Sequence, residues 1–173
     1  MREIRIGQTT NVDCYLEGNR LVGRVKEFEL DDFEYEPVEH AALGMVGKLK
    51  LPGRMANELM GTITFSWLET ELLLKTLKPN TGVTFQFEKF VDVFDQDGVI
   101  VAEGYRIITT ATLLFGKTSF DAFKNSNDGI GVKHECSVIR LAVKSTETDK
   151  FLIEYAPMES INRVNGEDVW ARY

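Results

Sequence analysis

The sequence predicts a mainly β fold: an antiparallel β-sandwich or barrel with one flanking α-helix and long loops. Apolar and polar residues alternate with a period of two along most of the chain, and turn residues separate the alternating segments. Only one segment has its apolar residues at helical spacing. The chain has 173 residues and no Pro/Gly/Ser-rich linker or internal repeat. We therefore expect residues 1–173 to form a single domain.

The first predicted strand spans residues 22–36 and contains a change of phase. Phe28 and Leu30 fall on even positions, whereas Phe33 and Tyr35 fall on odd ones. A bulge or bend at residues 31–32 would keep all four apolar side chains on one side. The opposite face would then carry Glu27, Glu29, Glu34 and Glu36.

A segment without clear periodicity follows, at residues 38–56. It contains Gly44, Gly47, Pro52 and Gly53 and joins two predicted strands. Long loops inside compact domains usually carry a function. We expect this segment to be a long excursion from the domain.

Residues 57–67 are predicted to form the next strand, and a helix is expected at residues 67–78. Ile63 and Phe65 lie on one face of the strand, together with Leu59 and Trp67. Ser66 has the position of a helix N-cap, and Glu69 would complete a capping box. Pro79 would end the helix.

The second half of the chain predicts several more strands. Residues 83–94 place Phe85 and Phe87 on one face and Glu88 and Asp92 on the other. A turn at residues 95–98 leads into a second β-rich run, 99–115, which predicts a hairpin. We also expect a second loop at 116–131, strands at 133–144 and 151–155, and a tight turn at 165–166.

Composition and charge exclude several classes of protein. Twenty basic and 27 acidic residues give a formal charge of −7. Lys and Arg do not cluster as they do in proteins that grip phosphates. No apolar run approaches the ~20 residues that span a bilayer. Residues 1–5 are not followed by an apolar stretch, so no signal peptide is expected.

The sequence offers no catalytic or metal-binding pattern. His40 and His134 lack further ligands at metal-site spacing, and Cys14 and Cys136 do not form a Cys-x-x-Cys pair. Residues 44–48 lack the complete phosphate-loop pattern. We expect neither an enzyme nor a cofactor or metal site.

Segments towards both ends of the chain carry a resemblance to a known family. Residues 152–155 are followed by 158–168, which end in a Val-Asn-Gly turn with an acidic residue after it. These segments resemble the closing segment of the major tail tube proteins of contractile (myovirus-type) phage tails or phage tail-like particles. Residues 23–30 resemble their early strand, and 43–47 their Gly-Met-x-Gly loop. Residues 40–44 depart from the pattern, because such proteins often carry a glycine cluster there.

This resemblance implies a structural subunit rather than an enzyme. Such subunits form hexameric rings that stack into a hollow tube inside a contractile sheath, and four strands of each join an inner β-barrel. We assign these inner strands to residues 22–36, 57–67, 83–94 and 99–112. The implied partners are further copies of the chain and the tail sheath, tape measure, baseplate and terminator proteins. The implied location is the virion tail tube, assembled in the cytoplasm of a bacterial host.

Two sets of site residues follow from the resemblance and the residue pattern. An acidic bore would let DNA pass without specific binding. The predicted lumen residues are Glu27, Glu29, Glu34, Glu36, Glu88 and Asp92. The segment 38–56 would attach the subunit to a neighbouring subunit or ring, because its apolar residues are costly to expose. These are Leu43, Met45, Val46, Leu49 and Leu51.

Two alternatives remain open at the level of sequence. The tube could belong to a DNA-free injection particle, such as a bacteriocin or a type VI secretion ring protein. The chain could instead be a monomeric β-barrel that binds a ligand or acts as an enzyme through its acidic face.

Overall fold

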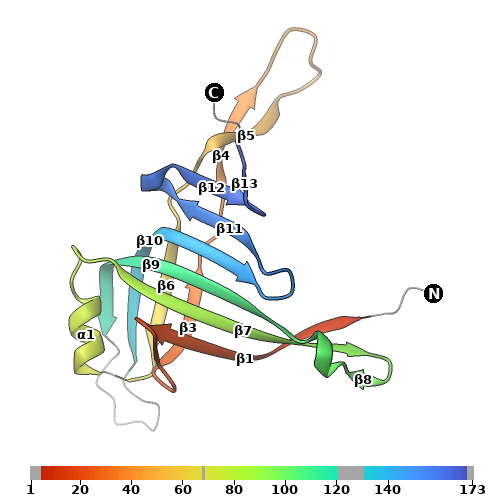
Figure 1. Cartoon of the computed structure of the whole chain (residues 1–173). Helices are drawn as coiled ribbons and strands as arrows, with labels where there is room; N and C mark the ends of the chain where they lie inside the picture. The colour runs from red at the N-terminus through yellow and green to blue at the C-terminus, as the bar shows by residue number, and fades with distance from the viewer. Residues whose placement is uncertain (1–4, 68, 121–130, 171–173) are drawn as a thin grey trace.

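The computed structural model describes residues 5–67, 69–120 and 131–170 (Figure 1). Nearly all regular structure in this part of the chain is β-strand, and one α-helix lies among the described elements. The elements in order are β1 (Ile6–Leu16), β2 (Asn19–Arg20), β3 (Val25–Leu30), β4 (Tyr35–His40), β5 (Leu49–Ala56), β6 (Met60–Phe65), α1 (Thr70–Thr76), β7 (Val83–Asp95), β8 (Gly98–Val99), the 3₁₀ turn η1 (Val101–Glu103), β9 (Tyr105–Phe120), β10 (Val132–Ser145), β11 (Lys150–Ala156), the 3₁₀ turn η2 (Pro157–Glu159), β12 (Ile161–Val164) and β13 (Glu167–Asp168).

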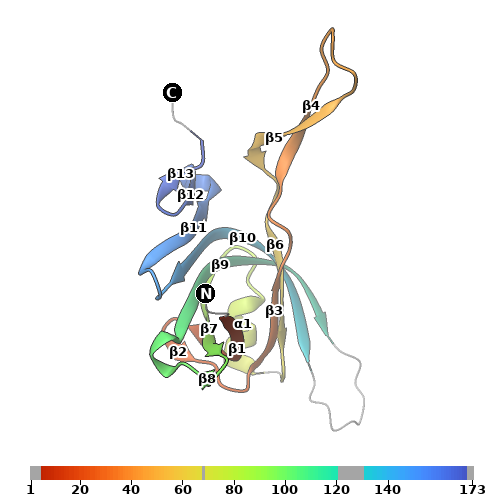
Figure 2. The ribbon, with the colours of Figure 1, turned by 90° about the vertical axis from the view of Figure 1, so that its right-hand side faces the viewer.

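One large antiparallel sheet dominates the molecule. Its strands run in the order β13-β12-β11-β10-β9-β7-β1-β2, with β6 on β10 and β3 on β6. β10 lies along β9 on one side, while its other side pairs with β6 over Val132–Ser137 and with β11 over Leu141–Ser145. The sheet can therefore curl into an open barrel, which Figure 2 shows nearly end-on. The prediction of a mainly β, antiparallel sandwich or barrel with one helix is confirmed.

The core fills the space inside the curl. Ile63, Phe85 and Leu113 from three different strands are fully buried. The rings of Phe28 on β3 and Phe87 on β7 stack with centroids 4.1 Å apart and planes 2° from parallel. This contact brings β3 and β7 face to face across the core, although β6, β10 and β9 separate them within the sheet. The predicted alternation in β6 and β7 therefore selects the correct inward faces.

The helix is shorter than predicted, and its predicted cap is wrong. α1 begins after Glu69, which is its N-cap and makes no side-chain capping bond. The backbone N–H of Ser66 instead donates to the carbonyl of Arg24 at 2.8 Å, so Ser66 still belongs to the β3–β6 ribbon. The Glu69 carboxylate lies 3.1 Å from the Arg24 guanidinium. Trp67 was expected on the core face, yet its side chain is 49% exposed.

Three strand predictions also need correction. The predicted strand 22–36 is two strands, β3 and β4, separated at residues 31–34. The predicted strand 99–112 begins with β8 and η1, so that β9 starts only at Tyr105 and continues into the predicted loop 116–131. Residues 121–130 of that loop lie outside the described residues. β1 was not predicted at all.

The segment 38–56 is ordered structure rather than an irregular excursion. β4 and β5 form a two-stranded antiparallel sheet of their own, which we call the arm (residues 35–56). The arm projects far from the barrel in both ribbon views (Figures 1 and 2). Near its base the strands approach so closely that a Cβ on Gly53 would lie 2.4 Å from the Glu36 carbonyl oxygen, which explains a glycine at this position.

Candidate assembly surfaces

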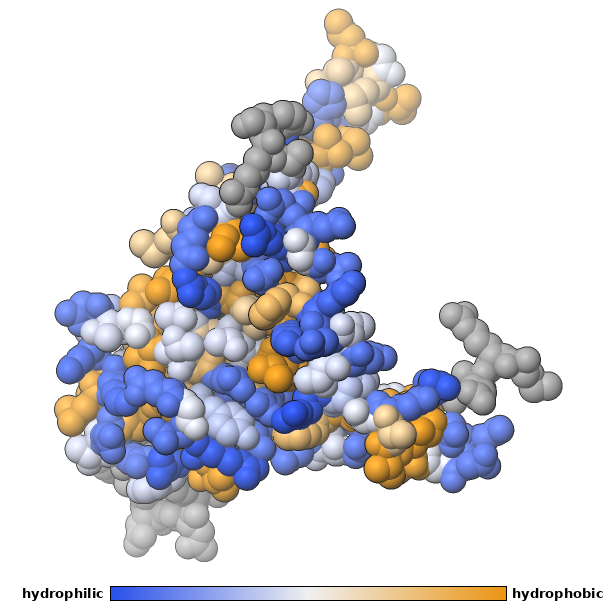
Figure 3. Space-filling model, in the orientation of Figure 1, coloured by the Kyte–Doolittle hydropathy of each residue, from blue (hydrophilic) through white to orange (hydrophobic). Residues whose placement is uncertain are grey.

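The tip of the arm exposes apolar side chains that no other described part of the chain covers. Leu43 and Val46 are as exposed as in an extended peptide, at 107% and 108%. Met45, Leu49 and Leu51 are also exposed. Figure 3 shows these residues as a hydrophobic cap at the far end of the arm. Full burial of Leu43 or Val46 would contribute about 1.5–3 kcal/mol each, so the tip is suited to an interface.

The arm carries residues that protect it from random strand pairing. Pro37 in β4 lies opposite Pro52 in β5. Both strands of a two-stranded ribbon are edge strands, and proline removes a backbone N–H donor from such an edge. The arm is therefore a poor template for extension of the sheet, and its apolar tip is the more specific contact surface.

A strip of negative charge runs along β3 to the base of the arm. We call it the acidic strip; it comprises Glu27, Glu29, Asp31, Asp32, Glu34 and Glu36, all of them exposed. Residues 27–36 contain no Lys or Arg. Within the described part of the chain, none of these six carboxylates forms an ion pair. Because Phe28 points into the core, Glu27 and Glu29 on either side of it point outward.

The other two predicted lumen residues lie on a different face. Glu88 is 7% exposed, accepts a hydrogen bond from Gln86 Nε2 at 2.7 Å and lies 3.4 Å from Arg106. Phe28 on β3 and Phe87 on β7 point toward each other across the core. The residues next to Phe28 therefore point out on one side of the molecule, and the residues next to Phe87 point out on the opposite side. The structure thus separates Glu27, Glu29, Glu34 and Glu36 from Glu88 and Asp92.

The outer face of the wide sheet holds a series of ion pairs that sequence reasoning missed. Arg20 bonds both oxygens of Asp13, at 2.6 and 2.7 Å, and this hydrogen bond raises the pKa of the guanidinium. Further pairs on the sheet and its turns are Arg106–Glu88, Lys144–Asp149, Arg140–Glu159 and Arg163–Asp168. Arg106–Glu88 and Arg140–Glu159 join residues that lie far apart in the chain, which no local sequence pattern reveals. The charges of these pairs are compensated within the subunit.

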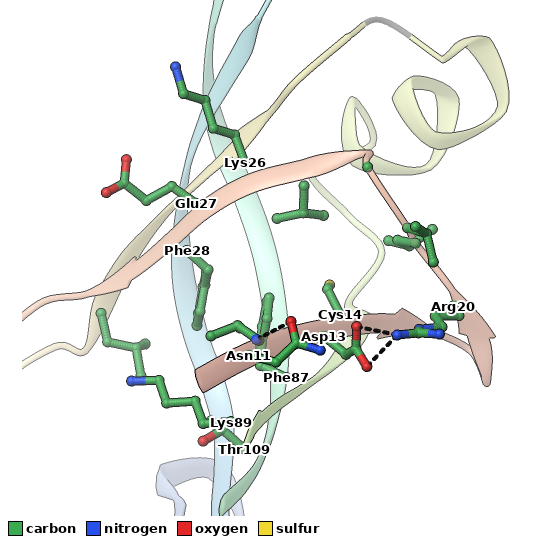
Figure 4. Close-up of a pocket in the computed structure, with 16 residues that line it drawn as sticks. Asn11, Asp13, Cys14, Arg20, Lys26, Glu27, Phe28, Phe87, Lys89 and Thr109 are labelled. Atoms are coloured by element: carbon green, nitrogen blue, oxygen red, sulfur yellow. Dashed lines mark hydrogen bonds and ion pairs between the residues drawn. The ribbon is translucent and has the colours of Figure 1, made fainter. Parts of the chain in front are cut away.

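A groove of about 630 Å³ lies where the barrel is open between β1 and β3 (Figure 4). Phe28, Phe87 and Cys14 contribute to its wall, and Arg20 and Lys89 are among its polar residues. Burial raises the pKa of the Cys14 thiol to about 12, so this sulfur stays protonated and is a poor nucleophile. The groove marks the gap in the barrel and holds no arrangement of a nucleophile beside a base.

The buried polar groups of the core hold the helix to the sheet. His134 on β10 lies between the rings of Phe65 and Phe115. Its Nε2 is 3.2 Å from the hydroxyl of Thr76 on α1, and its Nδ1 is 2.8 Å from the hydroxyl of Thr118 on β9. Burial lowers the pKa of His134 to about 4, so the ring is neutral near pH 7.

Cys136, two residues further along β10, has a similar structural role. Its thiol donates to the Gly61 carbonyl at 3.2 Å, and burial raises its pKa to about 12.

Across residues 5–67, 69–120 and 131–170, no three His, Cys, Asp or Glu residues gather as a metal site would require. None of the helices in the same ranges is long and apolar enough to cross a membrane.

Comparison with known proteins identifies one matching family. The family model described as phage tail tube protein FII matches residues 8–173, which is nearly the whole chain. No curated protein matches the chain.

Proposed function

Because the chain belongs to the phage tail tube protein FII family, we propose that it builds the inner tube of a contractile phage tail as stacked hexameric rings. Membership of this family makes it a structural, virion-borne subunit that assembles with copies of itself and with other tail proteins, and points away from an enzyme.

The exposed tip of the arm carries the proposal. In a free subunit five apolar residues are exposed to water, which is unfavourable. An assembled tube would bury them against a neighbouring subunit or ring. The projecting shape of the arm suits such a contact, because it extends beyond the edge of its own barrel (Figure 2). We therefore assign Leu43, Met45, Val46, Leu49 and Leu51 to attachment.

The bore of the tube would be lined by a negatively charged face that lets DNA slide past. Only one of the two separated groups of carboxylates can face the same bore. The acidic strip is the stronger candidate, because none of its carboxylates forms an ion pair with a described residue, whereas Glu88 is already paired with Arg106. We accordingly place Glu27, Glu29, Glu34 and Glu36 at the bore.

The tube would also contact the other proteins of the tail. The outside of the tube would contact the tail sheath protein, and its ends would contact the baseplate and terminator proteins. A tape measure protein would occupy the bore during assembly in the cytoplasm of the bacterial host. On sheath contraction the tube would pierce the target envelope and conduct DNA.

The arm assignment is tested by making the tip polar. We expect Leu43→Ser/Val46→Ser to leave the circular dichroism spectrum and the thermal midpoint of the free subunit unchanged, because both side chains are fully exposed. The same variant should no longer form tubes in negative-stain electron microscopy.

Met158→Ser is the matched control, since Met158 is also a strongly exposed apolar residue but lies far from the tip. This variant should form tubes normally. Normal tubes from the tip variant would contradict the assignment.

A further inference from the structure

The chain connects the base of the arm to the barrel through two narrow crossing segments. β4 and β5 form a sheet separate from the main one, and the chain crosses between them and the barrel at residues 31–34 and 57–59. Two backbone hydrogen bonds bridge this crossing, from Asp31 N to Met60 O at 2.9 Å and from Asn57 N to Glu34 O at 2.8 Å. A two-stranded ribbon is only marginally stable by itself, so something else must hold the arm at a fixed angle.

Four aromatic residues from distant parts of the chain meet at this crossing. We call Phe33, Tyr35, Tyr155 and Trp170 the clamp. The rings of Phe33 and Tyr155 meet edge to face at 5.0 Å, and those of Tyr35 and Trp170 do so at 6.0 Å. Phe33 and Tyr35 also contact each other edge to face, at 5.5 Å. The clamp therefore joins the start of the arm to β11 and to the residues that follow β13.

Polar contacts reinforce the clamp from both strands of the arm. The amide of Asn162 on β12 donates to the Tyr35 hydroxyl at 3.1 Å. The guanidinium of Arg54 on β5 lies 5.8 Å from the centroid of the Trp170 ring, a cation–π contact. Both β4 and β5 are thus tied to residues 161–170, which comprise β12, β13 and the turn that follows and which we call the C-terminal hairpin. It lies beside the base of the arm in Figure 1.

We propose that the C-terminal hairpin, through Trp170 and Asn162, is a positioning element that fixes the orientation of the arm on the barrel. An arm held in one orientation loses less conformational entropy when its tip binds a partner. The inference concerns the subunit itself and does not depend on the proposed tube function.

The inference is tested by measuring where the arm points. Spin labels are placed at Val46→Cys on the tip and at Asn80→Cys in the exposed loop between α1 and β7 of the full-length chain. The native Cys14 and Cys136 are buried and react slowly. Pulsed electron–electron double resonance on the monomer then gives the distribution of distances between the labels. We expect one narrow peak, and at least a two-fold broader peak when Trp170→Ala is added.

Two variants serve as controls. Trp67→Ala removes an exposed tryptophan outside the clamp and should leave the peak narrow, and Trp170→Phe, which keeps an aromatic ring, should restore most of the narrow peak. An unchanged peak in folded Trp170→Ala would overturn the inference. If circular dichroism shows that Trp170→Ala is unfolded, Asn162→Ala decides: a broader peak supports the inference and an unchanged one refutes it.

Discussion

At the scale of single residues, buried polar side chains join different elements of the fold through hydrogen bonds. His134 occupies a position that an apolar residue could fill, yet it joins Thr76 on the helix to Thr118 on β9. The sequence placed His134 in a strand without a metal partner. It did not reveal the contact with Thr76, because 58 residues separate the two in the chain.

The neutral state of His134 predicts a specific dependence of stability on pH. Its pKa is about 4 in the folded protein and ~6.5 in the unfolded chain, so the unfolded state binds the proton first as the pH falls. The free energy of unfolding should therefore be unaffected by this residue above pH 6.5 and should fall between pH 6.5 and 4. The loss is about 3 kcal/mol at ~1.36 kcal/mol per pKa unit.

The measurement compares urea unfolding of the wild type and of His134→Gln across this range. Gln keeps hydrogen-bonding capacity but does not titrate, so the wild type should lose about 3 kcal/mol more than the variant. His40→Gln is the control, because it replaces a histidine on the arm and keeps His134 in the core. Parallel pH curves for the wild type and His134→Gln would show that His134 does not titrate in this way.

At the scale of elements, the sequence predicted the strands that have one buried face. β6 and β7 alternate clearly because one side packs on the core and the other meets water. The same reasoning missed β1, in which only Cys14 and Leu16 are buried among eleven residues. It also missed the arm, whose two faces are both largely exposed, so neither strand needs to alternate.

The close approach of the arm strands predicts that alanine substitutions at two glycines of the arm differ in their effect on the stability of the arm. Gly53→Ala would bring a Cβ to 2.4 Å from the Glu36 carbonyl, a backbone atom that cannot move without bending β4. Gly47→Ala in the same arm meets nothing within 4 Å and should be neutral or slightly stabilising.

Limited proteolysis with trypsin can separate the two variants, since the arm contains Lys48, Lys50 and Arg54. We expect cleavage within the arm to be several-fold faster in Gly53→Ala than in the wild type, and unchanged in Gly47→Ala. Equal rates in both variants would mean that the arm absorbs the clash without opening.

At the scale of the whole molecule, charge is distributed unevenly over a net −7. Several charged residues on the large sheet lie in ion pairs, whereas no carboxylate of the acidic strip forms an ion pair with a described residue. The sequence predicted the negative face on β3, because glutamates alternate with aromatic residues there. It could not show that Glu88 and Asp92 point the other way, since this depends on how β3 and β7 meet across the core.

This uneven distribution predicts which side of the subunit faces the bore of an assembled tube. A cysteine in the bore should react with a small maleimide that diffuses along the tube, but not with a bulky polyethylene-glycol maleimide that cannot enter. We expect Glu29→Cys tubes to show this selectivity, with Cys14 and Cys136 silent because their buried thiols have pKa values of about 12. Asp97→Cys, at the exposed turn after β7, is the comparison, and both cysteines should react with both reagents in the free subunit. If assembled Glu29→Cys tubes reacted equally with the bulky reagent, the acidic strip would lie outside the tube, and the electrostatic account of DNA passage would need another face.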